Sequence, residues 1–270
     1  ADGQSEKVTF NASLQNVGRM QNSFAAVIYA SDGVTDVTSN YDLECLYGTL
    51  EVTPRPLKIT TQSGDKVYDG TALTDSGYEI TAGSVAEGQE ADIRVTGSIT
   101  KVGKQENAVS VLIYDGGTDV TDNYRIEKET GTLEVTPRPL TIRVYDDTKV
   151  YDGTALTNAG YEITAGDVAA EQAIDVQTMG TQTTVGQSAN TAAVTITDGA
   201  GEEVTSNYDL TLVTGVLEIT PRKLVLQSSS KSKEYDGTIL TEEEYAVSEG
   251  SLADGQSEKV TFNASLQNVG

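Results

Sequence analysis

Lysines and asparagines at regular intervals are the residues of this chain with the clearest potential for covalent chemistry. Lys66, Lys149 and Lys233 occupy matching places in repeated sequence, and Asn123 and Asn207 recur further along. A lysine amine and an asparagine carboxamide held together beside a buried carboxylate can form an amide bond, with loss of ammonia. The alternative, which we favour, is a solvent-facing strand lysine beside a turn asparagine.

Acidic loops are a second candidate for chemistry, because calcium binds clusters of oxygen ligands. Asp115, Asp119 and Asp122 crowd one loop, and Asp32 and Asp36 stand in related positions. The spacing does not match the EF-hand pattern, and the third copy of the loop shifts its acidic residues. We therefore favour solvated turn acids and expect no cofactor, with calcium kept as the alternative.

The composition argues against catalysis. The chain has no histidine, which excludes histidine-based catalytic triads and histidine-ligated zinc sites. No glycine-rich phosphate loop of the GxxxxGK type occurs. Carboxylate pairs for glycoside hydrolysis remain compatible with the composition. The single cysteine, Cys45, has no partner within the chain, so we interpret it as a small apolar filler, with a reactive thiol as the alternative. The sequence predicts a protein that is not an enzyme.

The charge balance narrows the choice of partners. The chain carries 41 acidic and 18 basic residues, a net charge of −23. Phosphate binding requires clustered lysine and arginine, so nucleic acid and anionic membranes are not expected as partners. No apolar run reaches the length needed to span a bilayer, so we expect no membrane insertion in this segment.

These residues recur because the whole sequence repeats, with a unit of about 84 residues. Two motifs mark the repeat: LEVTPRPL at 50–57 and 133–140, with LEITPRKL at 217–224, and KVYDGTALT at 66–74 and 149–157, with KEYDGTILT at 233–241. Residues 253–270 also copy residues 1–18. Such self-similarity is typical of arrays, in which spacing and reach matter more than a single pocket.

Short runs of β-branched and aromatic residues alternate with polar ones inside each unit, which predicts strands. In the second unit the expected strands contain Leu57–Ile59, Tyr78–Ala82, Ile93–Val95, Val109–Ile113, Tyr124–Ile126 and Leu133–Val135. Turn residues separate these runs at the spacing of a sandwich or barrel. The predicted fold is all-β, with tandem Ig-like antiparallel β-sandwich domains arranged end to end as an elongated rod.

Three structural motifs recur in every unit. A tyrosine precedes an Asp-Gly turn, an Asn-Tyr pair bends the chain by an Asx turn while its ring enters the core, and a proline closes the unit. These motif residues are Tyr68, Asp69, Gly70, Tyr151, Asp152, Gly153, Tyr235, Asp236, Gly237, Asn40, Tyr41, Asn123, Tyr124, Asn207, Tyr208, Pro54, Pro137 and Pro221.

All five prolines lie at the seams between units, and the strand alternation resumes directly after them. The last strand of one unit is therefore expected to lead into the first strand of the next through a stiff, short junction. The predicted domains are 1–54 (the C-terminal part of a repeat), 55–137 and 138–221 (complete repeats) and 222–270 (the N-terminal part of a repeat).

The repeat resembles the bacterial Ig-like repeats of the YDG or MBG type. Their opening K-x-Y-D-G-T matches residues 66–71, 149–154 and 233–238, and their closing N-Y…G-x-L-x-V-T-P-R matches 40–55, 123–138 and 207–222. The third opening departs from the pattern at Glu234 and Ile239. The resemblance implies a large bacterial protein, secreted or attached to the cell surface, whose repeats act as stalks. It implies no catalytic residues.

The predicted function is therefore that of a stiff stalk or filament, located outside the cell or on the bacterial surface. Its partners would be neighbouring repeats or copies of itself. One alternative is an adhesin whose repeats bind a host glycan or protein. Another is a subunit that polymerises head to tail, because the part-units 1–54 and 222–270 together make one unit; a window from a longer array explains the same ends.

Overall fold

The computed structural model describes residues 3–264, and these form an all-β chain, as predicted. Besides strands, this part contains only three short 3-10 turns, η1 (Thr38–Asn40), η2 (Thr121–Asn123) and η3 (Thr205–Asn207). No helix in residues 3–264 has the length and apolar character to cross a membrane. The outer ends of the predicted parts 1–54 and 222–270, and of the duplicated segments, lie outside the described residues.

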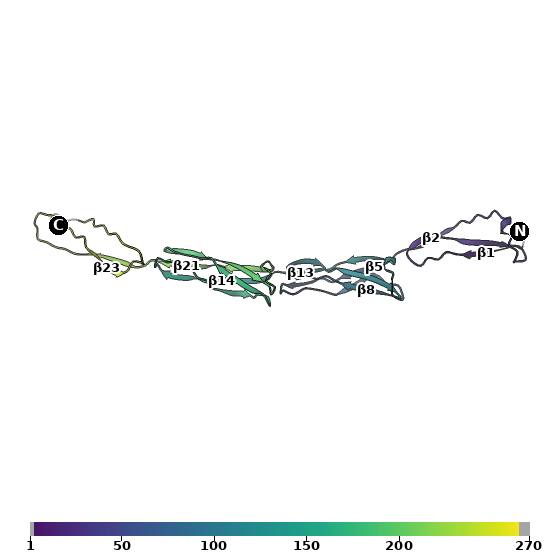
Figure 1. Ribbon diagram of the computed structural model, residues 1–270, viewed down its shortest axis with the longest axis horizontal. Helices are drawn as coiled ribbons and strands as arrows, with labels where there is room; N and C mark the ends of the chain where they lie inside the picture. The colour runs from purple at the N-terminus through teal and green to yellow at the C-terminus, as the bar shows by residue number, and fades with distance from the viewer. Residues whose placement is uncertain (1–2, 265–270) are drawn as a thin grey trace. The chain divides into compact units, whose positions relative to one another are not determined.

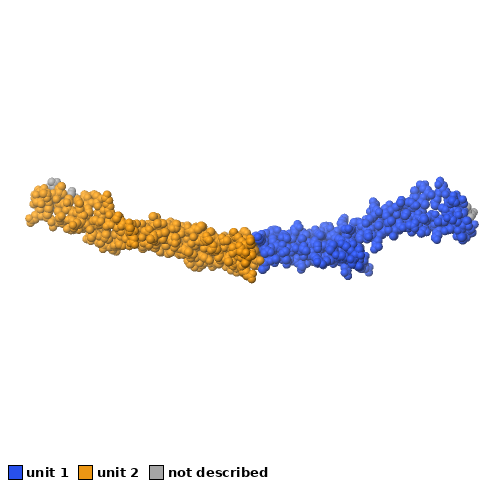
Figure 2. Space-filling view, viewed as in Figure 1, with its two compact units in different colours: residues 1–66, 71–135 blue, residues 67–70, 136–270 orange. Residues whose placement is uncertain are grey.

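The chain divides into two compact units, coloured separately in Figure 2. Unit 1 contains residues 1–66 and 71–135, and unit 2 contains residues 67–70 and 136–270. Each therefore holds most of one complete sequence repeat and one part-repeat. Residues 67–70, which belong by sequence to the second repeat, group with unit 2. The predicted domain boundaries themselves stay a prediction.

The first part-repeat, in unit 1, folds into two antiparallel strand pairs. β1 pairs with β3, and β2 pairs with β4. Its strands are β1 (Ser5–Phe10), β2 (Gly18–Asn22), β3 (Phe24–Tyr29) and β4 (Gly48–Val52).

The second repeat completes unit 1 with three small sheets, in the orders β12-β5-β7, β6-β13-β9 and β11-β10-β8. Every run predicted as a strand lies within one. Figure 1 labels one strand of each sheet, namely β5, β13 and β8. The strands are β5 (Arg55–Thr61), β6 (Gly64–Val67), β7 (Tyr78–Gly83), β8 (Gln89–Val95), β9 (Gly103–Glu106), β10 (Val109–Asp115), β11 (Thr118–Asp119), β12 (Tyr124–Glu129) and β13 (Thr132–Thr136).

The third repeat, in unit 2, follows the same plan, with sheets ordered β16-β14-β20, β15-β21-β18 and β17-β19. Its strands are β14 (Arg138–Val144), β15 (Asp147–Val150), β16 (Tyr161–Gly166), β17 (Ala173–Thr178), β18 (Gly186–Asn190), β19 (Ala192–Thr197), β20 (Tyr208–Val213) and β21 (Gly215–Thr220). The last part-repeat contributes one antiparallel pair, β22 (Leu224–Ser228) with β23 (Tyr245–Gly250).

The sheets are not purely antiparallel, which corrects the sequence-based prediction. β12 runs parallel to β5, β20 runs parallel to β14, and β21 runs parallel to β15. In each case an early strand of a repeat pairs with one of its last two strands. A parallel pair needs a long crossover, and here most of the repeat supplies it. Period-two alternation reports which face of a strand is buried and carries no information on direction, so the sequence could not reveal this.

The core of each complete repeat lies where the predicted strand residues face inward. In the second repeat one cluster consists of Leu57, Ile59, Val109, Val111, Ile113 and Tyr124. Buried Asn107 anchors the end of this core, because its Nδ2 donates to Gln62 O (2.9 Å) and Asp75 O (3.0 Å). Asn190 makes the same pair of bonds in the third repeat. The two hydrogen bonds of each buried asparagine tie together two segments that are distant in the sequence.

Candidate structural site at the repeat junctions

The chain passes from the second repeat to the third with a single residue between strands. β13 ends at Thr136, Pro137 follows, and β14 begins at Arg138. Proline fixes φ and donates no backbone hydrogen bond. The Tyr-Asp-Gly loop reaches the same place, because Tyr68 N donates to Thr136 O at 2.9 Å. This segment delivers the Tyr68 side chain to the third repeat.

Tyr68 is buried within unit 2, with 3% of its surface exposed. Its ring meets that of Tyr208 edge to face, at a centroid distance of 5.7 Å and an interplanar angle of 76°. Its hydroxyl oxygen accepts a hydrogen bond from Gln172 Nε2 at 2.8 Å. Burial of a tyrosine is favourable when the ring packs and the hydroxyl finds a partner, and both conditions are met here.

Gln172 links the two tyrosines. Its Oε1 accepts from Tyr208 Oη at 2.6 Å, while its Nε2 donates to Tyr68. Ala169 N in turn donates to Tyr208 Oη at 2.9 Å. Burial raises the pKa of Tyr208, against the opposing effect of the Ala169 amide. The tyrosine of one repeat is thus held by an amide and a tyrosine of the next.

Arg138 joins the same junction through its guanidinium. Its Nε donates to Asp167 O (2.9 Å) and its Nη2 to Asp167 Oδ1 (2.6 Å). Its Nη1 donates to Tyr68 O at 3.3 Å. The planar fork of arginine can engage several acceptors in fixed geometry, which a lysine cannot do. We refer to Tyr68, Arg138, Gln172 and Tyr208 as the Tyr68 junction.

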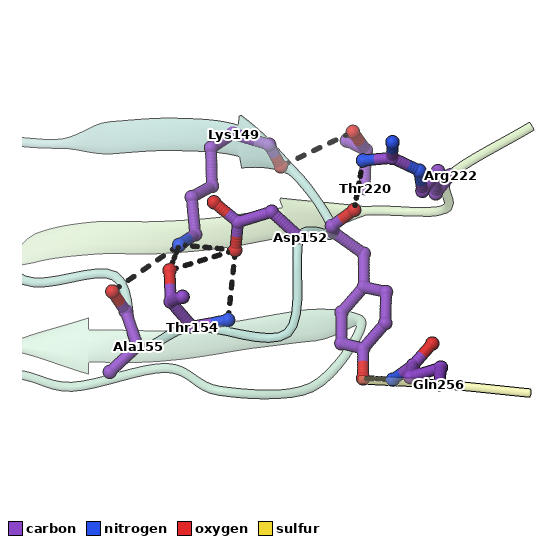
Figure 3. Close-up of polar contacts among 8 residues, drawn as sticks. Lys149, Asp152, Thr154, Ala155, Thr220, Arg222 and Gln256 are labelled. Atoms are coloured by element: carbon purple, nitrogen blue, oxygen red, sulfur yellow. Dashed lines mark hydrogen bonds and ion pairs between the residues drawn. The ribbon is translucent and has the colours of Figure 1, made fainter. Parts of the chain in front are cut away.

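The same arrangement recurs where the third repeat meets the last part-repeat, also within unit 2 (Figure 3). Gln256 Nε2 donates to Tyr151 Oη at 2.6 Å, and Arg222 Nη1 donates to Tyr151 O at 3.5 Å. Arg222 also holds the loop after β23, through Ser251 O (2.6 Å) and Ser251 Oγ (2.7 Å). Tyr151 is half-buried here.

The receiving half of the junction is also present in unit 1. Tyr124 Oη donates to Gln89 Oε1 at 2.5 Å, and Arg55 Nε donates to Ser84 O at 2.6 Å. Tyr41 Oη bonds Gln4 Oε1 in the first part-repeat. The receiving groups are therefore built into each repeat and do not depend on an incoming tyrosine.

The recurring lysines are engaged inside their own Tyr-Asp-Gly loops. Lys149 Nζ donates to Asp152 Oδ1 (2.8 Å), Thr154 Oγ1 (2.7 Å) and Ala155 O (3.3 Å), as Figure 3 shows. Lys233 makes the corresponding bonds to Asp236 and Thr238. The Lys149 ammonium and the Thr154 amide hold the pKa of Asp152 well below its usual range. The lysine shapes the turn, and an amide bond to asparagine stays a hypothesis.

The Asn-Tyr turn differs from the prediction in which side chain forms it. The local acceptor is an aspartate: Asp119 Oδ1 accepts from Thr121 N (2.9 Å) and Thr121 Oγ1 (2.6 Å). Asn123 Oδ1 instead accepts from Val17 N at 2.7 Å, a bond to the preceding part-repeat within unit 1. The predicted entry of the following ring into the core is confirmed at Tyr124 and Tyr208, which are 8% and 7% exposed.

The acidic loop proposed for calcium lies beside this contact. Asp115, Asp119 and Asp122 line a hollow of about 650 Å³ together with Asn16 and Asn123. Asp119 Oδ1, however, already accepts hydrogen bonds from Thr121. Across residues 3–264, no three acidic, cysteine or histidine side chains converge as metal ligands would. Cys45 is a free, half-buried thiol.

The structure brings together some predicted motif residues and leaves others apart. Tyr68 meets Tyr208, whereas Tyr235 is 70% exposed and Tyr41 is 40% exposed. Pro137 lies at the junction, as its place in the sequence suggested. Sequence reasoning missed Arg138 and Gln172 as junction residues. Their signal was present in the sequence. An arginine follows Pro54, Pro137 and Pro221, and a glutamine stands three residues after the first Ala of each duplicated segment, at Gln4 and Gln256.

No protein-family model matches this chain, and no curated protein matches it.

Proposed function

We propose that the chain is a structural repeat region, a stiff stalk or filament segment of a bacterial surface or extracellular protein. One observation carries the proposal: the Tyr68 side chain, from the Tyr-Asp-Gly loop of one repeat, is buried against the next repeat and packs on Tyr208. A tandem array in which each repeat places a side chain in its neighbour resists bending at the seam. Stiffness is the property that a spacer needs.

The junction restrains both bending and twisting. Pro137 limits rotation of the main chain at the seam, and the Arg138 guanidinium bridges the loop of its own repeat to the preceding one. The buried edge-to-face pair adds contact on another side of the connection. A fixed main-chain dihedral and two side-chain contacts at one short linker support a tandem arrangement of Ig-like sandwiches that extend end to end.

The proposed location follows from the resemblance to YDG or MBG repeats together with the charge. A net charge of −23 and a single half-buried cysteine suit a soluble region of a surface protein. The repeats would then hold other parts of the polypeptide away from the cell envelope. Within the array the partners are neighbouring repeats.

Small-angle scattering of the 270-residue chain tests the proposal. We expect the profile of a stiff, elongated particle at several protein concentrations extrapolated to infinite dilution. A Tyr68→Ala, Arg138→Ala double variant should scatter as a bent ensemble, with a broader distribution of interatomic distances. A matched variant at an exposed position, Tyr235→Ala, should leave the profile unchanged. A round or freely jointed wild-type particle would refute the stalk.

A second candidate function is direct binding of a host glycan, and one observation favours it. β7 and β16 share the sequence YEITAG, and each lies at the edge of its sheet. Tyr78 and Ile80 are 42% and 43% exposed, and Tyr161 and Ile163 are 36% and 40% exposed. An aromatic and an aliphatic side chain thus recur at the surface once per complete repeat, as a repeated ligand site would require.

A glycan array distinguishes the adhesin from the pure spacer. Binding by the wild-type chain that is lost in a Tyr78→Ser, Tyr161→Ser double variant, and kept in Tyr235→Ser, would support the adhesin. Absence of binding across the array would leave the stalk as the better explanation. Both tyrosines of the double variant are exposed, so the fold should survive the substitutions.

A further inference from the structure

The beginning and the end of the third repeat run side by side. β14 pairs in parallel with β20, and β15 pairs in parallel with β21. Arg138 lies opposite Tyr208 and Val150 lies opposite Thr220, so the partners stand 70 residues apart in both pairings. The constant separation shows that residues 138–150 and 208–220 follow each other without a slip in register. We refer to these two segments as the end-strand pair.

The end-strand pair stays connected where it passes from one sheet to another. β14 and β20 belong to one sheet, and β15 and β21 belong to the next. Between them, Asp146 Oδ1 accepts a hydrogen bond from Val216 N at 2.8 Å. At the far end, Tyr151 N donates to Thr220 O at 2.9 Å, and Thr220 Oγ1 donates to Lys149 O at 3.4 Å (Figure 3). Hydrogen bonds therefore join the two segments in both sheets and at the change between them.

The polypeptide enters and leaves the third repeat at opposite ends of this pair. β14 begins at Arg138, directly after Pro137, and β21 ends at Thr220, directly before Pro221. Because the paired strands are parallel, Arg138 and Thr220 lie about 40 Å apart at a rise of about 3.3 Å per residue. Tension along the chain therefore pulls the two segments in opposite directions along their own length.

This direction of pulling loads the hydrogen bonds in shear. The evenly spaced bonds of a parallel pair then share the load and must break together. An antiparallel pair such as β17 with β19, pulled at its open end, would instead separate one residue pair after another. Residues 151–207 lie between the two segments in the chain, so they carry no tension while the end-strand pair holds.

The second repeat contains the same device. β5 pairs in parallel with β12, and β6 lies beside β13. An ion pair also crosses this pairing, because Lys58 Nζ lies 3.2 Å from Glu127 Oε1 and 2.9 Å from Glu129 Oε2. The arrangement is therefore a property of each complete repeat.

We propose that the end-strand pair is the load-bearing element of each complete repeat, and that under tension it must slide apart before the rest of the repeat can unfold. This inference rests on the proposed stalk, because a spacer between an envelope and the parts it holds transmits pulling forces. Forced unfolding is governed by the unfolding rate, so resistance to force depends on the contacts that break first.

Two isoleucines of the third repeat provide a matched pair of substitutions. Ile142 lies on β14, inside the end-strand pair, and Ile196 lies on β19, outside it. Both are 0% exposed. Ile142→Ala and Ile196→Ala remove the same atoms from buried strand positions, so both should lower the midpoint of urea unfolding. Under tension their effects should differ, because the contacts of Ile196 are still intact when the end-strand pair separates.

Optical tweezers measure this difference on the full chain, held at constant tension through peptide tags at its two ends. The wild type should show two long extensions, one for each complete repeat of about 84 residues. Each should release at most about 260 Å, the extended length less the 40 Å already spanned. Ile142→Ala should make one of the two extensions at least about tenfold faster and leave the other unchanged. Ile196→Ala should leave both rates within about twofold of the wild type.

Equal acceleration by the two alanine variants, or no acceleration by Ile142→Ala, overturns the proposal. If either alanine variant fails to fold, Ile142→Val and Ile196→Val repeat the comparison with a smaller deletion and the same expected order. The result is separate from that of the scattering experiment. A chain that scatters as a stiff particle but is accelerated equally by both variants keeps the stalk and loses the load-bearing pair. A freely jointed chain in which Ile142→Ala alone is accelerated loses the stalk and keeps the pair.

Discussion

At the scale of single residues, identical side chains in identical motifs reach different environments. Tyr68, Tyr151 and Tyr235 all stand in K-x-Y-D-G-T, yet they are buried, half-buried and 70% exposed, respectively. Tyr68 contacts the Tyr208 ring, Gln172 and Arg138. Tyr151 is held by hydrogen bonds from Gln256 and Arg222. The motif provides the tyrosine, and the contacts that its side chain makes determine how much it stabilises the fold.

This difference in burial predicts that the same substitution lowers the free energy of unfolding by different amounts at the motif tyrosines. Tyr68→Ala should lower the free energy of unfolding of unit 2 by about 3 kcal/mol, because it empties a packed aromatic site. Tyr235→Ala should change it by less than about 0.5 kcal/mol, since its side chain is largely solvated. Tyr68→Phe should cost about 1 kcal/mol through the lost bond to Gln172. Urea unfolding followed by circular dichroism measures all three, and equal costs at positions 68 and 235 would contradict the junction.

The Lys149–Asp152 pair predicts a dependence of stability on pH. The ammonium of Lys149 and the Thr154 amide lower the pKa of Asp152 in the folded state. A carboxyl with a depressed folded pKa contributes stability above its unfolded pKa of about 3.9. That contribution is lost as pH falls from there through the folded pKa.

Thermal unfolding between pH 7 and pH 2 measures this effect. Asp152→Asn should melt at a lower temperature than the wild type at pH 7, and the difference should shrink as the pH falls below about 4. A difference in melting temperature that stays constant over the whole range would show that the carboxylate charge plays no part. Asp209→Asn, an exposed strand position of the same repeat, is the control.

At the scale of elements, a glycine ends each of the strands β7, β16 and β23, and it lies against the backbone at the start of the first strand of the same repeat. Gly83, Gly166 and Gly250 all have positive φ (76°, 74° and 81°). A Cβ on Gly166 would overlap the carbonyl oxygen of Pro139, and Gly83 stands in the same relation to Pro56. The close approach lets β16 pair with β14 right up to the seam prolines. Only glycine meets both demands.

A pair of Gly→Ala substitutions separates the requirement for a positive φ from the requirement for space at the Cβ position. Gly201 also has positive φ (84°), but a Cβ there would meet no atom within 4 Å. Gly201→Ala should therefore cost about 1 kcal/mol, for the backbone conformation alone. Gly166→Ala should cost more, because β16 must also move away from Pro139. Urea unfolding of both variants provides the comparison, and an equal cost would show that the close contact is unimportant.

At the scale of the whole molecule, charge governs how copies approach one another. The calculated isoelectric point is about 4.2, far from neutral pH, and self-repulsion keeps such chains dispersed. We predict minimal solubility near pH 4.2, detected as a turbidity maximum in a titration from pH 7 to pH 3. Circular dichroism should still report strands at that pH. Turbidity that rises only after the strands melt would instead indicate unfolding as the cause.

The sequence by itself determined the all-β class and the strand positions of the second repeat. These follow from local chemistry: alternation marks a half-buried strand, and proline or glycine marks its end. It also indicated that Tyr124 and Tyr208 are buried. It did not reveal the parallel pairings, the roles of Arg138 and Gln172, or the loop-shaping role of Lys149. Those depend on which distant segments meet.

The duplicated segment shows most directly that sequence alone does not determine whether a segment forms a strand. Residues 5–10 form β1 because β3 is present to accept their backbone hydrogen bonds. Residues 257–262 have the same sequence and, among the described residues, form no strand. A strand is stable only when a neighbour satisfies its amides and carbonyls, and a neighbour is supplied by tertiary structure. The sequence pattern determines whether a segment can form a strand, and a neighbouring strand that accepts its backbone hydrogen bonds determines whether it does.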